Sequence, residues 1–165
     1  MDSLNTAMDN PPGKFYRVQS PESTVTWDES GLHAIAEADL RTEEEVLDAV
    51  KEKLRRNSIR NSPFIPVFSD RQKALDWALA LKHLCNGIVS VIEIDTNMLG
   101  EGIAVSAERA RKLLGSGSIT DRWYDSEWLI LGHVPSSAIV SWKEIEDPRP
   151  DSSNINWPEG VTHNQ

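Results

Sequence analysis

The sequence has very little cysteine, few basic residues and no long apolar run. Cys85 is the only cysteine among 165 residues, so no intrachain disulfide can form and a disulfide-stapled secreted scaffold is excluded. No apolar stretch approaches the roughly 20 residues that a membrane-spanning helix needs. The N-terminus also lacks the basic-then-apolar pattern of a signal peptide. These absences predict an intracellular protein, cytoplasmic or nuclear, without a membrane partner.

Basic side chains are outnumbered by acidic ones. The chain has 17 Lys and Arg against 26 Asp and Glu, which gives a formal net charge of -9. A protein that binds nucleic acid without sequence preference needs clustered basic residues to neutralise phosphates. We therefore expect no nucleic-acid partner, although one or two local arginines could still hold a small anionic ligand.

The motifs that most directly reveal enzymes are missing. The sequence has no Cys or His pair at metal-ligand spacing, no glycine-rich phosphate loop that opens a helix, and no Gly-x-Ser-x-Gly elbow. The four histidines are scattered, and none is paired with a nearby acid in an evident triad. We expect no metal site.

Composition predicts one globular domain with two tails. Hydrophobic residues make up 39% of the chain and charged residues 26%, as in soluble domains of this size. Residues 1–13 are predicted to be a disordered N-terminal tail, residues 14–147 a single domain, and residues 148–165 a disordered C-terminal tail. The sequence leaves the oligomeric state open.

The stretch 62–95 predicts a strand, a helix and a second strand in immediate succession. The apolar run Phe64–Phe68 is too short for a helix and rich in strand formers. Ser69 stands at the N-cap position of the following helix, with Gln72 at capping-box spacing. Residues 87–95 give the strongest strand signal in the chain. The other elements are expected to pack around this unit.

The remaining elements are fewer and more weakly signalled. Thr42 predicts the N-cap of a long helix, with Glu45 at the matching capping-box position. We expect strands at 14–19, 127–134 and 138–145, helices at 42–56 and 106–114, and a loop with a short helix between 23 and 39. Helices dominate the first two thirds and strands the last third, which predicts an α+β fold.

Two places carry candidate chemistry. Arg17 lies inside an apolar strand beside Tyr16, where it is either an edge residue with its head in water or a forked cation for phosphate or carboxylate. Asp125 and Glu127 are two residues apart, so both lie on one face of an extended chain. They are either solvated charges or a pair of acids acting on a sugar, one stabilising positive charge and the other directing a nucleophile.

Taken in order, these segments resemble the ADP-ribosyltransferase superfamily. Its pattern is an aromatic residue and Arg, a Ser-Thr-Ser strand running into an Ala-x-x-aromatic-Ala helix, and Glu-x-Glu before a strand. The matching segments are Tyr16-Arg17, Ala74 with Trp77-Ala78, and Asp125-x-Glu127. The segments 62–70, 94–95 and 128–135 are also similar to uncharacterised domains from filamentous fungi. The resemblance covers roughly residues 14–145.

The resemblance implies a small, mixed, mostly antiparallel split β-sheet with flanking helices, and NAD as ligand and substrate. Arg17 is expected to clasp the pyrophosphate or ribose of NAD, with Tyr16, Ser69 and Trp128 completing the cofactor-binding set. Glu127 is expected to bond the nicotinamide ribose and favour the oxocarbenium-like state. Asp125 takes the place of the acceptor-directing glutamate, and ADP-ribose passes to a protein side chain or to water.

The Ser-Thr-Ser motif is degenerate. Counting back from Ala74, its positions fall on Pro66, Val67 and Phe68, so the hydroxyls that support the ribose and the glutamate are absent. Loss of a supporting shell loosens a site and lowers the rate. The alternative is therefore a catalytically inactive protein-interaction domain on the same scaffold. An enzyme needs Arg17 and Glu127 on opposite walls of one pocket.

Overall fold

Two antiparallel sheets form the framework of the structure, a computed structural model that describes residues 11–56, 62–100, 103–106, 108–109 and 126–146. The strands are β1 (Lys14–Gln19), β2 (Thr26–Asp28), β3 (Gly31–His33), β4 (Phe64–Phe68), β5 (Ser90–Asp95), β6 (Ala104–Ser106), β7 (Glu127–Leu131), β8 (His133–Pro135) and β9 (Ile139–Glu144). The helices are α2 (Glu43–Arg56) and α3 (Arg71–Leu84), with 3-10 turns η1 (Thr96–Met98) and η2 (Ser136–Ala138). The larger sheet has the order β6-β7-β4-β1-β5-β9 and the smaller one β2-β3-β8. The predicted α+β class is confirmed.

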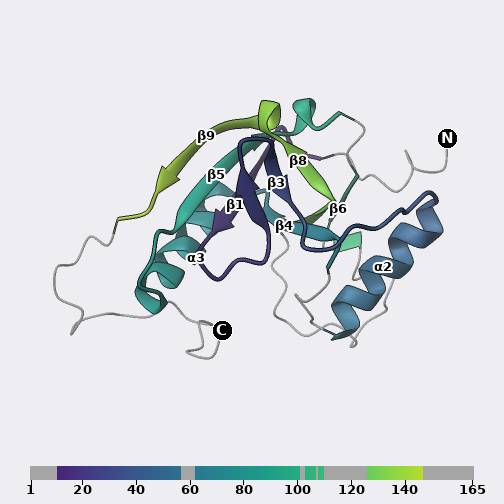
Figure 1. Cartoon of the computed structure of the whole chain (residues 1–165), viewed down its shortest axis with the longest axis horizontal. Coiled ribbons are helices and arrows are strands. Elements are labelled where there is room, and N and C mark those ends of the chain that lie inside the picture. Colours follow the sequence, from purple (N-terminus) through teal and green to yellow (C-terminus); the bar gives the residue numbers. More distant parts are fainter. Residues whose placement is uncertain (1–10, 57–61, 101–102, 107, 110–125, 147–165) are drawn as a thin grey trace.

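The two sheets and the two helices form three apolar clusters. One face of the large sheet packs on the small sheet, where Phe15, Ile92 and Ile130 meet Leu32 and Val134. The other face is covered by α3 over the β1–β5 half and by α2 over the β4–β7–β6 half. Figure 1 shows the two helices at opposite ends of the molecule. The core is therefore divided by the large sheet.

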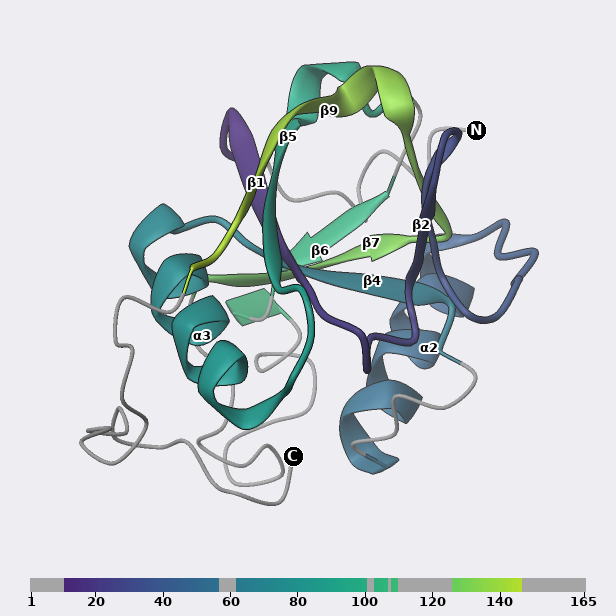
Figure 2. The same ribbon diagram turned by 60° about the vertical axis from the view of Figure 1, so that its left-hand side comes forward.

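The large sheet changes direction between β1 and β4. All of β1 pairs with β5, whereas β1 and β4 share only the pair Tyr16↔Phe68. In Figure 2, β4, β6 and β7 run across the view while β1, β5 and β9 run up it. Because β4 and β5 both run antiparallel to β1, the segment β4–α3–β5 is the predicted strand–helix–strand crossover.

The expected loop between residues 23 and 39 is wrong. The structure has the hairpin β2–β3 there, and Gly31 turns it with a φ of 125° that side chains rarely adopt. The expected single strand 127–134 is also interrupted. Gly132, with a φ of 78°, separates β7 in the large sheet from β8 in the small one.

The N-cap of α2 follows the sequence prediction. The Thr42 hydroxyl accepts from the Glu45 amide at 3.2 Å, and the Glu45 carboxylate accepts from the Thr42 amide at 3.1 Å. The helix places Val46 and Val50 against Phe64 and Leu129. A second predicted helix, 106–114, lies mostly outside the described residues. None of the described helices is long and apolar enough to cross a membrane.

The predicted cap of α3 is wrong by one residue. Asp70, not Ser69, is the N-cap, and its carboxylate accepts from the amides of Gln72 at 2.8 Å and Lys73 at 3.2 Å. A carboxylate reaches two amides of the first turn at once and also favours the positive end of the helix dipole.

Replacing the cap of α3 should destabilise the domain measurably. We expect Asp70→Ala to lower the free energy of unfolding by about 1 kcal/mol, because two amides lose their acceptor. Asp70→Asn should stay within a few tenths of a kcal/mol of the wild type, since asparagine caps equally well. Urea unfolding followed by circular dichroism measures both. Equal losses in the two variants would contradict the capping role.

Candidate functional site

Three remote segments meet where β1, β4 and β7 lie side by side. Tyr16 pairs with Phe68, and Phe68 pairs with Glu127, so these residues form one row across three strands. Cross-strand partners in a sheet carry their side chains on the same face. The segments that the resemblance singled out are therefore brought together by the central strand β4.

Arg17 lies at the point where β1 and β4 diverge. Its Nη1 donates to the carbonyl oxygen of Pro66 at 3.0 Å, and its Nε donates to the Gln19 amide oxygen at 3.1 Å. Gln19 is itself held, because its Nε2 donates to the carbonyl of Val25 at 2.6 Å. The guanidinium therefore has a fixed orientation that the packing of β1 and β4 supplies.

Pro66 explains why the arginine is needed there. Two backbone hydrogen bonds join the ends of β4 to β7: the Ser69 amide donates to the Ser126 carbonyl, and the Gly132 amide donates to the Pro63 carbonyl. The odd-numbered residues along β4 therefore direct their backbone N–H and C=O groups toward β7. By alternation, the Pro66 carbonyl points toward β1. Proline has no N–H to continue that ladder, so the strands separate and the Arg17 side chain satisfies the carbonyl.

The charge of Arg17 is partly buried and has no compensating carboxylate among the described residues. Burial lowers the pKa of Arg17 to about 10, so the side chain stays protonated at neutral pH. No carboxylate within the described part of the chain pairs with it, and the two oxygens that it donates to, from the Gln19 amide and the Pro66 carbonyl, are neutral. A partly desolvated cation of this kind is stabilised by an anion that reaches it.

Arg17 and Glu127 leave their strands on opposite faces. Arg17 alternates with Tyr16 and so shares its face with Phe15, whose ring lies 5.2 Å from that of Trp128. Glu127 precedes Trp128 and shares its face with Phe68. The guanidinium returns toward the plane of the sheet, where it meets the Pro66 carbonyl between the two strands. No contact between the Arg17 guanidinium and the Glu127 carboxylate is found within the described part of the chain.

Two of the predicted cofactor-binding residues have structural roles. Trp128 is only 8% exposed and packs on Phe15 in the core, so its indole is not a free stacking surface. The Ser69 hydroxyl donates to the Ser126 carbonyl at 3.2 Å, which ties the end of β4 to the start of β7. Asp125 lies outside the described residues. Tyr16 is half-buried and packs, like Phe68, on the α3 side of the large sheet.

Comparison with known families places this chain. The family model for a domain of unknown function, DUF7587, matches residues 10–147. The chain belongs to the DUF7587 family. No curated protein matches the sequence. The match covers every element of this DUF7587 domain described above, from β1 to β9.

The DUF7587 domain also has a polar cluster that its sequence did not reveal. His33 and His133 are cross-strand partners whose rings stack at 4.4 Å. His33 Nε2 lies 2.6 Å from the Ser30 hydroxyl and 3.3 Å from Asp28, so a histidine is paired with an acid after all. Hydrogen bonds from Ser30 lower the pKa of Asp28. A catalytic relay needs Ser and Asp on different ring nitrogens, and here both contact the same one.

Proposed function

We propose that this domain binds NAD on an ADP-ribosyltransferase-like scaffold, with Arg17 as the receptor for the pyrophosphate. The observation that carries the proposal is the partly buried, oriented Arg17 guanidinium, which has no carboxylate partner within the described residues. A forked guanidinium with a fixed orientation matches phosphate oxygens in geometry and charge. The anion would supply the compensation that the neutral oxygens of Pro66 and Gln19 do not.

Glu127 is the proposed catalytic residue, with Asp125 as the acceptor-directing acid. Glu127 lies two pairs along the β4–β7 ladder from Pro66, whose carbonyl Arg17 contacts, since Pro66 pairs with Leu129 and Phe68 with Glu127. In this role Glu127 bonds the nicotinamide ribose, and the ADP-ribose group passes to a protein acceptor or to water. The proposal does not choose between these two acceptors of the ADP-ribose group.

The proposed activity is degenerate. The positions that should offer hydroxyls to the ribose hold Pro66, Val67 and Phe68, and Val67 is buried in the core. Arg17 and Glu127 also start on opposite faces of the large sheet. A site that lacks its supporting groups loses rate before it loses binding. We therefore expect NAD binding with slow release of nicotinamide.

Binding can be tested by thermal unfolding with and without NAD. Saturation at a hundred times the dissociation constant stabilises a domain by about 2.7 kcal/mol, which shifts the melting temperature by roughly 5–10 °C at this chain length. We expect Arg17→Met and Arg17→Lys to remove the NAD-dependent shift. Arg41→Met, which alters an exposed arginine paired with Asp39, serves as the matched control and should keep the shift.

The same preparation tests the chemistry. Slow nicotinamide release should be abolished by Glu127→Gln, while the NAD-dependent shift is retained. Release that is unchanged in Glu127→Gln would remove this residue from the reaction. A wild-type domain that shows no shift at millimolar NAD, or an Arg17→Lys variant with an undiminished shift, would contradict the binding proposal.

A second candidate function is a catalytically inactive protein-interaction domain on the same scaffold. The side chains at positions 66–68 favour it, because an apolar strand of Pro66, Val67 and Phe68 offers no hydrogen bonds to a ribose. Under this alternative Arg17 serves only to satisfy the Pro66 carbonyl. NAD would then produce neither a thermal shift nor nicotinamide, which separates the two functions in the experiments above.

A further inference from the structure

The strand β9 forms a free edge of the large sheet. It is last in the strand order, and its residues from Val140 to Glu144 are all exposed. Val140 is 54% exposed and Trp142 is 61% exposed, although both are large apolar side chains. An exposed apolar edge strand is a ready template for another strand, and proteins usually shorten or cover such edges.

The backbone of β9 has groups available for pairing. The Ile145 amide donates to the Val89 carbonyl at 2.8 Å. In the same register Lys143 is opposite Val91 and Ser141 is opposite Glu93, so their backbone groups also point toward β5. By alternation, the N–H and C=O groups of Trp142 and Glu144 point away from β5. No described strand pairs with that side of β9.

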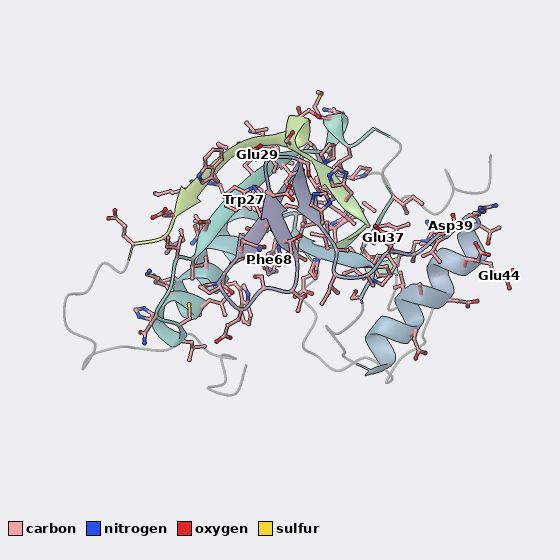
Figure 3. The ribbon with its side chains drawn as sticks, viewed as in Figure 1. Trp27, Glu29, Glu37, Asp39, Glu44 and Phe68 are labelled. Atoms are coloured by element: carbon pink, nitrogen blue, oxygen red, sulfur yellow. The ribbon has the colours of Figure 1, made fainter. Side chains whose placement is uncertain are left out.

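Two tryptophans, Trp142 of β9 and Trp27 of β2, form an aromatic pair beside this edge, which we call the Trp142–Trp27 ledge. The Trp142 ring meets that of Trp27 of β2 edge-on, with centroids 5.6 Å apart. Trp27 is partly buried against the core, so it holds Trp142 in place while most of the Trp142 side chain stays in solvent. Figure 3 labels Trp27 on the β2–β3 hairpin, with Glu29 at its turn. An exposed indole that is oriented by a second ring can attract a basic side chain over its face, by about 0.5–1 kcal/mol.

Charge decides which occupant fits. Glu144 follows Trp142 by two residues and shares its face, whereas Lys143 points to the opposite face. The whole chain has a formal charge of -9, so a second copy would bring like charge to the same edge.

We propose that β9 is a docking strand for an extended basic peptide segment of a partner protein. The segment adds to the large sheet by hydrogen bonds to Trp142 and Glu144. It places Lys or Arg side chains over the Trp142–Trp27 ledge, next to Glu144. Such strand addition takes affinity from the main chain and specificity from alternate side chains. The proposal concerns a surface other than the Arg17 region and does not depend on NAD binding.

The probe is an alternating Lys–Val peptide of about seven residues, long enough to span an edge strand. Fluorescence anisotropy should show saturable binding, and Trp142→Ala should weaken it about tenfold or more. Ile35→Ala, at an exposed isoleucine outside β9, is the matched control and should not change the affinity. An alternating Glu–Val peptide of the same length should not bind.

Hydrogen exchange measured residue by residue locates the peptide. The amides of Trp142 and Glu144 should exchange fast in the free domain and slow down with the Lys–Val peptide, while those of Lys143 and Ile145 are protected in both states. Protection elsewhere, equal binding of the Glu–Val peptide, or no binding would overturn the proposal. Concentration-dependent dimers that protect Trp142 without peptide would identify a second copy as the occupant and would also overturn it.

Discussion

Gly31→Ala should lower the free energy of unfolding by more than about 4 kcal/mol, one of the largest effects of any single substitution in this domain. Gly31 has a φ of 125° at the turn of the β2–β3 hairpin, a conformation that is essentially restricted to glycine. A Cβ there would lie 1.9 Å from the Val134 carbonyl oxygen and 2.9 Å from the Ser136 amide nitrogen. Both obstacles are backbone atoms, which cannot rotate away as a side chain can.

Gly132→Ala is the matched control for this experiment. Gly132 also has a positive φ, 78°, but no heavy atom other than those of its chain neighbours lies within 4 Å of the position that its Cβ would take. Its cost should be limited to about 1–2 kcal/mol for the left-handed backbone. Urea unfolding of both variants measures the difference. If the two variants lost the same stability, the close contact between β3 and β8 would be wrong.

Phe15→Ala should lower the free energy of unfolding by about 3–5 kcal/mol. Phe15 is fully buried in the core between the two sheets and contacts Trp128 in a tilted ring pair with centroids 5.2 Å apart. Alanine would leave a cavity among residues that belong to two different sheets, so collapse around it is restricted.

Two further variants make this result specific. Ile88→Ala, at an isoleucine that is 61% exposed, should change stability by no more than about 0.5 kcal/mol. Phe15→Leu should lose much less than Phe15→Ala because most of the volume is kept. Near-ultraviolet circular dichroism should report the altered surroundings of Trp128. A loss below about 1 kcal/mol in Phe15→Ala would contradict the central position of this side chain.

The elements that the sequence predicted well are those that local chemistry determines. The strands at 14–19 and 64–68 were predicted with the bounds that the structure has, because each is a short run of strand formers. The capping box of α2 was predicted from Thr42 and Glu45, which bond within one helical turn. These signals act over three or four residues and need no partner from elsewhere.

The misassigned elements depend on remote partners. β2 and β3 are three residues each and find their partners only in the small sheet, so their sequences alone give no strand signal. The continuous apolar run after Glu127 looked like one strand, but Gly132 divides it between two sheets. Trp128 was expected to bind the cofactor, and the tertiary fold buries it against Phe15.

The candidate site shows the same division. Arg17, Glu127 and the hydroxyl-free strand at 66–68 were identified from residue types and their order, and the sequence was sufficient for that. The structure supplied the register Tyr16↔Phe68↔Glu127 and the contact of Arg17 with a carbonyl 49 residues away. It also assigned the α3 cap to Asp70 rather than Ser69.

The sequence by itself therefore determined the α+β class, the central strand–helix–strand unit and the charged side chains of the candidate site. Only the tertiary structure decided on which face each of these side chains lies, which glycines turn the chain, and that β9 is left as an edge. The reason is that a strand exposes both of its faces and both of its edges until its neighbours are in place. Those neighbours come from distant parts of the chain, so burial, pairing and the compensation of a charge such as that of Arg17 are properties of the assembled sheets.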